Sequence, residues 1–301
     1  MWTCDFKLAV KGLEESPTAE MTCGSGLLLN VKGQAIAEAV FLCKSPNEYL
    51  FSLRESDVQP AYEALDKYLV ADDVTLKILE GEELPYTHVI AVPDSPTLSD
   101  AALARRVPPV ASKALDQVFF AKTHAWGLSI PRGLLGAKHE EYWVKNWDLL
   151  EWKTEEVADD EWTKKRLDAG VPEWGVDFGP NSLPLEFPLF HEISYHKGCY
   201  IGQEVIARAT YRGHMTRGWI RVRAPESQIL REDYLYVVGE LEKPVGKLTT
   251  VLGNCGMGLL RFSALEGASP EQSKQLVQKL ADGSGVISIF QVEKLLPEVV
   301  V

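Results

Sequence analysis

The sequence lacks paired cysteines and long apolar runs. Its five cysteines are odd in number, and no two of them form a Cys-x-x-Cys pair. This usage favours reduced thiols over a disulfide framework, and it lacks the ligand spacing of a zinc or four-cysteine cluster site. No uncharged apolar stretch reaches the roughly 18 residues that cross a bilayer. The first residues, MWTCDFKLAVKGLEESP, carry acids early and resemble neither a signal nor a transit peptide. We therefore expect a cytoplasmic protein outside the membrane.

Positive charge is also scarce. Lys and Arg total 31 against 43 Asp and Glu, which gives a net charge of −12. That balance opposes nonspecific attraction to phosphate backbones, so we expect no direct, stable binding to nucleic acid. The composition is ordinary for a globular protein, and 301 residues exceed what one hydrophobic core holds, so we expect two or more packed units.

The first hundred residues predict an α+β arrangement. Residues 26–43 read as two apolar strands joined around Lys32 and Gly33, and EYLFSL reads as a third strand. The segment SDVQPAYEALDKYLV then has apolar residues at helical spacing. VTLKILEG and HVIAVP are predicted as further strands, so the order differs from a regular βαβ series.

The middle and C-terminal segments give a mixed pattern. VFFAKTHAWGLSIPRG predicts paired strands, whereas EEYWVKNWDLLEW has helical spacing at Trp143, Trp147 and Leu150, which core packing explains better than a ligand site. EEVADDEWTKKRLDAG predicts a helix ended by Gly170. After residue 218, short strands (GWIRVR, YLYVVG, VGKLTTVL, MGLLRFSAL) predict a small β-barrel or sandwich, and SPEQSKQLVQKLADGSG predicts a late helix.

One stretch concentrates a thiol and positive charge. EISY predicts a strand, Lys197 and Gly198 a turn, and GQEVIARAT a helix. Lys197 and a helix N-terminus close to Cys199 would both lower the pKa of the thiol and raise its reactivity. The alternative is a buried, inert cysteine, and the residues alone leave these two interpretations evenly balanced.

Arginines follow this thiol without any acid between them. Between residues 205 and 223 the basic residues are Arg208, Arg212, Arg217, Arg221, Arg223 and His214. Such a run usually forms a solvated face, but in an acidic chain it favours a site for an anionic ligand, best of all a polyanionic tail. Glu204 and Arg208 are four residues apart, the spacing of a helix-surface pair.

A second group of acids lies upstream, in RLDAGVPEWGVDFGPNSLPLEFPL. Asp168, Asp177 and Glu186 are separated by glycines and prolines, which would suit acids on turns around a pocket that binds an amino-substituted heterocycle. Turn-capping acids are the simpler interpretation and are favoured from these residues alone. The spacing of His191, His196 and His214 matches no compact ligand pattern, so we expect no metal site.

Two motifs together carry a family resemblance. KGCYIGQEVIAR at 197–208 is followed by YRG, and RLDAGVPEWGVD is followed by PLEFPL. With these motifs the chain resembles the YgfZ-type folate-binding proteins, relatives of the glycine-cleavage T-protein (aminomethyltransferase) superfamily. The resemblance implies an α+β fold: a cloverleaf of α+β subdomains over residues 1–215 and a C-terminal β-barrel over 216–301, with tetrahydrofolate in a central hole.

The resemblance also implies a function. The chain would be a tetrahydrofolate-binding accessory protein in the maturation or repair of iron–sulfur proteins, and indirectly in tRNA thiolation. Its partners would be folate and iron–sulfur client or assembly proteins, and we expect a monomer. Cys199 and Lys197 would be the catalytic pair. The pterin would meet Asp177 and Glu186, the glutamate tail would meet basic groups, and the full cofactor-binding set is Asp177, Glu186, Gln203, Glu204, Arg208 and Arg212.

The chain departs from the family in ways that leave catalysis open. An aspartate credited with one-carbon transfer has no equivalent in GQAIAEAV, where only Glu38 is acidic, and the helix that ends in a Thr-Asn-Asp motif is missing or reduced. Asp168 stands where the family usually has Glu. The alternative function is a tetrahydrofolate-dependent aminomethyl- or methyltransferase, and a third interpretation is a scaffold that binds only proteins. Direct RNA modification comes last because of the net charge.

Overall fold

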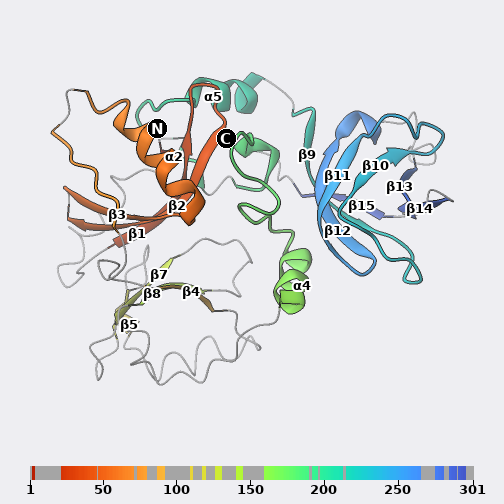
Figure 1. The fold of residues 1–301 in the computed structure, drawn as a ribbon, viewed down its shortest axis with the longest axis horizontal. Helices are drawn as coiled ribbons and strands as arrows, with labels where there is room; N and C mark the ends of the chain where they lie inside the picture. The colour runs from red at the N-terminus through yellow and green to blue at the C-terminus, as the bar shows by residue number, and fades with distance from the viewer. Residues whose placement is uncertain are drawn as a thin grey trace. The chain divides into compact units, whose positions relative to one another are not determined.

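The fold is taken from a computed structural model (Figure 1). Contacts between Cα atoms divide the chain into two compact units. Unit 1 comprises Met1–Val31, Ala35–Glu155 and His191–Ile201, and unit 2 comprises Lys32–Gln34, Glu156–Phe190 and Gly202–Val301. The residues that the structure describes are 2–3, 22–45, 47–70, 73–79, 87–91, 109–110, 117–119, 126–130, 140–144, 159–189, 192–195, 197–212, 215–265, 275–280, 285–289 and 291–295.

Unit 1 opens with an antiparallel sheet in the order β1-β2-β3. The strands are β1 (Thr22–Leu29), β2 (Ala35–Ser45) and β3 (Glu48–Ser52). Gly33 turns the first hairpin with a φ of +70°, a backbone region that glycine adopts without steric cost. The predicted hairpin around Lys32 and Gly33 and the predicted third strand are therefore confirmed.

Helix α2 (Glu55–Asp66) packs against β2, as Figure 1 shows. Acidic residues in its first turn interact favourably with the positive end of the helix dipole and so stabilise the helix. Ala61 is the apolar residue that α2 buries in a core shared with Trp2, Leu28 and Phe41. This helix was predicted from the spacing of its apolar residues, and that prediction is confirmed.

A second sheet of unit 1 has the strand order β4-β8-β7-β6-β5. Trp143, predicted to be helical, lies in a strand of this sheet, because pairing on both sides overrides its local spacing. VTLKILEG was predicted as a strand, but residues 73–79 have no regular structure. The strands are β4 (Thr87–Ala91), β5 (Pro109–Val110), β6 (Gln117–Phe119), β7 (Trp126–Ile130) and β8 (Glu140–Val144).

Unit 2 contains helix α4 (Asp159–Ala169), the 3₁₀ turn η3 (Pro184–Glu186) and helix α5 (Gln203–Arg212). Gly170 ends α4 with a φ of +76°, as the sequence predicts. A Cβ at Gly170 would lie 2.9 Å from Leu295, so close packing also requires glycine there. The helix predicted from GQEVIARAT is confirmed, but EISY forms no strand in residues 192–195.

A seven-stranded antiparallel sheet completes unit 2 and curls into a nearly closed barrel (Figure 1). Its order is β14-β13-β10-β11-β12-β9-β15. Residues on its inner face, such as Ile220, Leu235 and Leu248, form the core. The strands are β9 (Arg217–Arg223), β10 (Tyr234–Val237), β11 (Gly246–Leu252), β12 (Cys255–Arg261), β13 (Leu276–Lys279), β14 (Val286–Ile289) and β15 (Gln291–Lys294).

The predicted barrel is confirmed, whereas the predicted late helix is wrong in its described part. Residues Leu276–Lys279 form β13, because β10 and β14 pair with this segment on both sides, and three of its four residues are buried. The two compact units interleave along the chain, so the predicted domain boundary at 215/216 stays a prediction. None of the described helices is long and apolar enough to cross a membrane.

Candidate functional site

The motif that contains Cys199, KGCYIGQEVIAR at 197–208, is called the cysteine motif below. The segment before it is fixed to the N-terminal residues of unit 1. Thr3 donates from its Oγ1 to the Glu192 carbonyl oxygen at 2.5 Å, and its own carbonyl accepts the Ser194 amide at 2.9 Å. Thr3 Oγ1 also accepts the Leu27 amide at 2.8 Å, which ties the segment to β1. Both Thr3 and Glu192 are buried. The path of the chain into the motif is therefore set by hydrogen bonds to residues almost 190 positions away.

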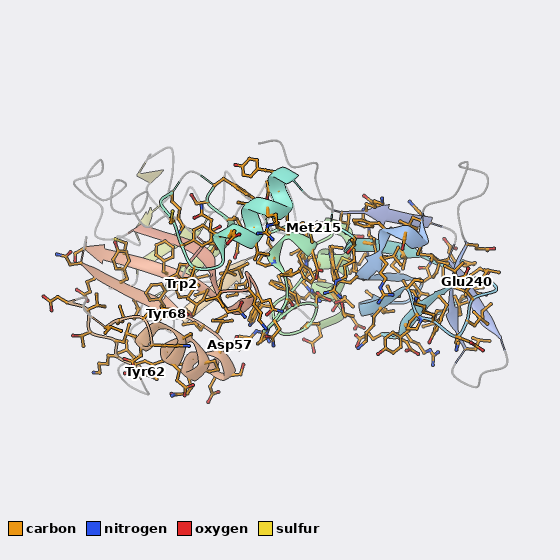
Figure 2. The ribbon with its side chains drawn as sticks, turned by 90° about the horizontal axis from the view of Figure 1, so that it is seen from above. Trp2, Asp57, Tyr62, Tyr68, Met215 and Glu240 are labelled. Carbon is orange, nitrogen blue, oxygen red and sulfur yellow. The ribbon has the colours of Figure 1, made fainter. Side chains whose placement is uncertain are left out.

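Lys197 anchors the start of the motif. Its ammonium donates to the Trp2 carbonyl oxygen and lies 4.4 Å from the centroid of the Tyr200 ring. Trp2 in turn stacks on Phe51 of β3, with ring centroids 5.0 Å apart, and Figure 2 labels it beside that sheet. The side chain of Lys197 thus holds the motif against the first sheet.

Cys199 is a free and exposed cysteine. This exposure contradicts the alternative of a buried cysteine, and the reactivity of the thiol stays a prediction. Gly198 beside it is exposed, and a Cβ there would meet nothing within 4 Å, so the backbone next to the thiol is open to a partner. Burial, and to a smaller extent Tyr195, raises the pKa of Tyr200 to about 12, so this phenol stays neutral at physiological pH.

The second half of the motif forms α5 in unit 2. Gly202, with a φ of +85°, precedes the first helical residue, Gln203, which is half-buried. Glu204 and Arg208 form the predicted ion pair at 2.6 Å, but both side chains are largely exposed, so the pair contributes little stability. Arg212 is the last residue of α5.

Asp177 is buried and its carboxylate is fully used within unit 2. Its Oδ2 pairs with Arg166 at 2.6 Å and accepts the Glu173 amide at 2.9 Å. Its Oδ1 accepts the hydroxyls of Thr249 and Thr250, both at 2.6 Å. Four donors occupy the lone pairs that a pterin would need. These contacts fit the alternative of a structural acid on a turn, and the predicted contact of Asp177 with a pterin stays a prediction.

Glu186 is also buried but only half satisfied. Its Oε1 accepts from Arg217 Nε at 2.5 Å, and this hydrogen bond raises the pKa of Arg217. Its Oε2 has no hydrogen-bond partner among the described residues. A buried carboxylate oxygen without a partner is costly, and it is the kind of atom that a ligand's N–H groups satisfy. Of the two acids predicted to meet the pterin, Glu186 has the free acceptor.

The predicted basic strip is mostly paired with protein groups. Besides Arg208 and Arg217, Arg221 binds Glu293 on β15 at 2.6 Å, and it donates to the carbonyls of Leu167 and Asp168 at the end of α4. Arg223 donates to Cys255 Sγ at 2.9 Å. Arg217, Arg221 and Arg223 therefore hold elements of unit 2 together, and the arginines of the predicted strip whose side chains the structure describes are engaged with protein groups. Asp168, predicted beside a pocket, is exposed.

Several residues that build these sites were missed by sequence reasoning. Trp2 and Thr3 fix the motif loop, and Thr249 and Thr250 satisfy Asp177. In these contacts the partners lie 72 or more positions away in the chain, so no local spacing could have revealed them. His191, His196 and His214 lie outside the described residues.

Comparisons with known proteins agree with this architecture. Residues 225–281 match the family model "CAF17, C-terminal beta-barrel domain". The chain is 30% identical over 96 residues to the tRNA-modifying protein YgfZ of Yersinia enterocolitica, a match that covers 31% of this chain and 29% of that protein. It is 32% identical over 111 residues to the mitochondrial iron-sulfur cluster assembly factor IBA57 of Mus musculus, covering 35% of this chain and 31% of the relative.

The curated relatives are thus matched over less than a third of their length. Among solved structures, the glycine cleavage system aminomethyltransferase T from Bartonella henselae superposes with a TM-score of 0.61 and 14% identity, over 92% of this chain and 76% of that one. At that identity the likeness concerns the fold, which confirms the predicted α+β class with a C-terminal barrel. The resemblance predicted from the two motifs is confirmed as a similarity: over about a third of its length the chain is similar to YgfZ and IBA57 proteins, and its fold resembles that of an aminomethyltransferase.

Proposed function

We propose that this chain is a tetrahydrofolate-binding accessory protein that acts through Cys199 in the maturation or repair of iron–sulfur proteins. The observation that carries the proposal is the exposed thiol of Cys199, in the hallmark motif, on a loop that Lys197 anchors to Trp2. Thiolates are both nucleophiles and ligands for iron, so an exposed thiol beside an open backbone suits contact with a client or assembly protein. The names of two relatives, a tRNA-modifying protein and an iron-sulfur cluster assembly factor, support the same general role.

Glu186 is the residue in unit 2 that fits a folate best. Its Oε2 is buried and without a partner among the described residues, so it can accept N–H groups of a pterin ring. Asp177 is left out of this proposal because its oxygens already accept four hydrogen bonds. Gln203, Glu204, Arg208 and Arg212, all on α5, remain proposed contacts for the rest of the ligand. When bound, tetrahydrofolate would supply a carrier for one-carbon groups.

The test of this proposal compares Cys199→Ala with Cys255→Ser, a control at a second free cysteine. Both proteins should fold and bind tetrahydrofolate in a calorimetric titration. In cells that lack the protein, Cys255→Ser should restore the activity of iron–sulfur enzymes, and Cys199→Ala should not. Full restoration by Cys199→Ala would remove the thiol from the proposed function.

Glu186 is tested separately, by Glu186→Gln. The amide keeps the size of the side chain but presents a donor where the pterin needs an acceptor. We expect tetrahydrofolate affinity to fall by about tenfold or more, because a site that loses its polar match leaves buried groups unpaired. Unchanged affinity in a folded variant would exclude Glu186 from the ligand site.

A tetrahydrofolate-dependent aminomethyltransferase is the second candidate, favoured by the fold it shares with aminomethyltransferase T. Glu38, on β2, is the acid that stands in the segment where that class of enzyme has its aspartate. Because this acid is a glutamate and not the aspartate credited with one-carbon transfer, we expect no turnover with an aminomethyl-loaded lipoyl carrier protein. Measurable turnover that Glu38→Gln abolishes would favour this candidate instead. The expected cytoplasmic location and monomeric state remain predictions.

A further inference from the structure

A row of lysine and tyrosine side chains crosses the outer face of the barrel. Tyr234 on β10 lies opposite Lys247 on β11. On its other side β10 pairs with β13, where Leu235 lies opposite Gln278, so the next step of the antiparallel ladder brings Tyr234 level with Lys279. Lys279 in turn lies opposite Val286 on β14. Figure 1 shows these strands next to one another in the barrel.

The outward direction of this row follows from the alternation along each strand. Leu235 and Val237 are buried in the barrel core, so Tyr234 and Tyr236 point away from it. Tyr234 is 47% exposed and Val286 is 38% exposed. The four side chains Tyr234, Tyr236, Lys247 and Lys279 are called the Tyr–Lys face below.

Each tyrosine of this face has a lysine above its ring. The Lys279 ammonium lies 4.4 Å from the centroid of Tyr236, and the Lys247 ammonium lies 5.8 Å from the centroid of Tyr234. Neither lysine forms an ion pair with an acid among the described barrel residues. Beside the row, Arg231 and Asp233 form an ion pair at 3.7 Å that offsets their charges, and Glu232 is exposed. The face therefore combines flat aromatic surface with two cations that form no ion pair with the acids that the structure describes.

We infer that the Tyr–Lys face binds single-stranded RNA, with bases on Tyr234 and Tyr236 and phosphates at Lys247 and Lys279. Bases stack on aromatic rings without regard to sequence, and lysines beside the rings neutralise the backbone. An acidic peptide would use the lysines but would gain little from the aromatic surface of the exposed Tyr234 and the half-buried Tyr236. A net charge of −12 and only two cations make this binding weak and sensitive to salt. The net charge led us to expect no direct, stable binding to nucleic acid. The inferred binding differs from stable binding because it is confined to this face and is transient.

This inference is independent of the folate and of Cys199. The probe is a fluorescein-labelled oligouridylate of about 12 nucleotides, followed by fluorescence polarisation at about 50 mM salt. The double variant Tyr234→Leu/Tyr236→Leu keeps apolar side chains on the sheet but removes the rings. We expect its affinity to fall by about tenfold or more, whereas Tyr234→Phe/Tyr236→Phe should bind like the wild-type protein, because stacking needs the ring and not the hydroxyl.

The lysines are tested through the salt dependence. Two neutralised phosphates predict a slope of about −1.4 in a plot of log affinity against log salt, and Lys247→Gln/Lys279→Gln should bring that slope close to zero. The matched control is Tyr68→Leu, which removes an exposed tyrosine that also has a lysine, Lys67, at 5.7 Å from its ring. This change in unit 1 should leave the affinity unchanged.

Three results would overturn the inference. Absence of binding to the oligouridylate at low salt is the first. The second is equal affinity of the leucine and phenylalanine variants, with folding of both checked by circular dichroism. The third concerns polyglutamate as a competitor. If polyglutamate displaces the RNA, and this displacement depends on the two lysines but not on the two tyrosines, the occupant is an acidic peptide.

Discussion

At the scale of single residues, Lys197 lies two positions from Cys199 in the sequence but binds other groups. It was predicted to act on the thiol two positions away, and its ammonium binds the Trp2 carbonyl and the Tyr200 ring. These contacts make Lys197 a positioning residue for the motif loop. They also explain why the motif has an aromatic residue at position 200, since the ring covers the lysine and is partly removed from water.

The environment of Tyr200 predicts a pH-dependent contribution to stability. Because burial raises the pKa of Tyr200 from 10.0 to about 12, the folded state favours the neutral phenol. This contribution is complete below pH 10 and is lost as the pH rises through about 12. Tyr200→Phe should therefore reduce the alkaline loss of stability, measured by denaturant titration above pH 10.

The absorbance of phenolate gives the control for this prediction. The difference between wild-type protein and Tyr200→Phe should be a titration centred near pH 12. Tyr49, whose pKa is also raised to about 12, mainly by burial, stays in both proteins and cancels in the difference. A difference centred near pH 10 would mean that Tyr200 is solvated like a free tyrosine.

At the scale of elements, the turn between β1 and β2 contacts the start of α5. A Cβ at Gly33 would lie 2.8 Å from the Cβ of Val205 and 3.2 Å from the carbonyl oxygen of Gly202. Gln34 of the same turn donates to the Asn181 carbonyl at 3.3 Å. The second half of the motif is therefore held by a segment far away in the sequence, and the contact needs a residue without a side chain.

Gly33→Ala tests this contact, with Gly239→Ala as its control. Both glycines have positive φ, +70° and +86°, so alanine strains either backbone by about 1–2 kcal/mol. At Gly239 a Cβ would meet nothing within 4 Å, whereas at Gly33 it also collides with Val205. We expect Gly33→Ala to lower the free energy of unfolding by more than Gly239→Ala does, measured by urea denaturation. Equal losses would show that the turn can move away from α5 freely.

At the scale of the whole molecule, each compact unit has its own means of cohesion. Unit 1 packs α2 and Trp2 on its first sheet. In unit 2 the buried carboxylate of Asp177 joins α4, through Arg166, to the two threonines of β11. Trp219 adds a hydrogen bond from β9 to the Gly170 carbonyl at 3.0 Å. We therefore expect the barrel and the segment 159–189 to unfold together.

Asp177→Ala should destabilise unit 2 strongly. It leaves the buried Arg166 without its closest counter-ion, a change that costs about 3–5 kcal/mol for a buried pair. Asp168→Ala, at an exposed carboxylate nearby, should cost less than about 0.5 kcal/mol. Calorimetric unfolding measures both. At temperatures where Asp177→Ala is folded, we expect it to bind tetrahydrofolate with unchanged affinity, and a loss of binding there would return Asp177 to the ligand site.

The sequence by itself determined the elements whose signals are local. The hairpin at Gly33, helices α2, α4 and α5, and the first four barrel strands follow from periodicity, turn residues and caps within a few positions. Its two motifs also determined the fold type, because long motifs in a fixed order are specific.

Only the tertiary structure decided the elements and contacts that depend on distant partners. Residues 140–144 and 276–279 form strands because neighbouring strands pair with them on both sides, which local spacing cannot express. The distinction between Asp177 and Glu186 has the same origin. One carboxylate meets threonines 72 and 73 positions away and is saturated. The other meets a single arginine, and its second oxygen has no partner in the part of the chain that the structure describes. Hydrogen bonding in a buried site is settled by which groups the fold brings within reach, and that is a property of three-dimensional packing.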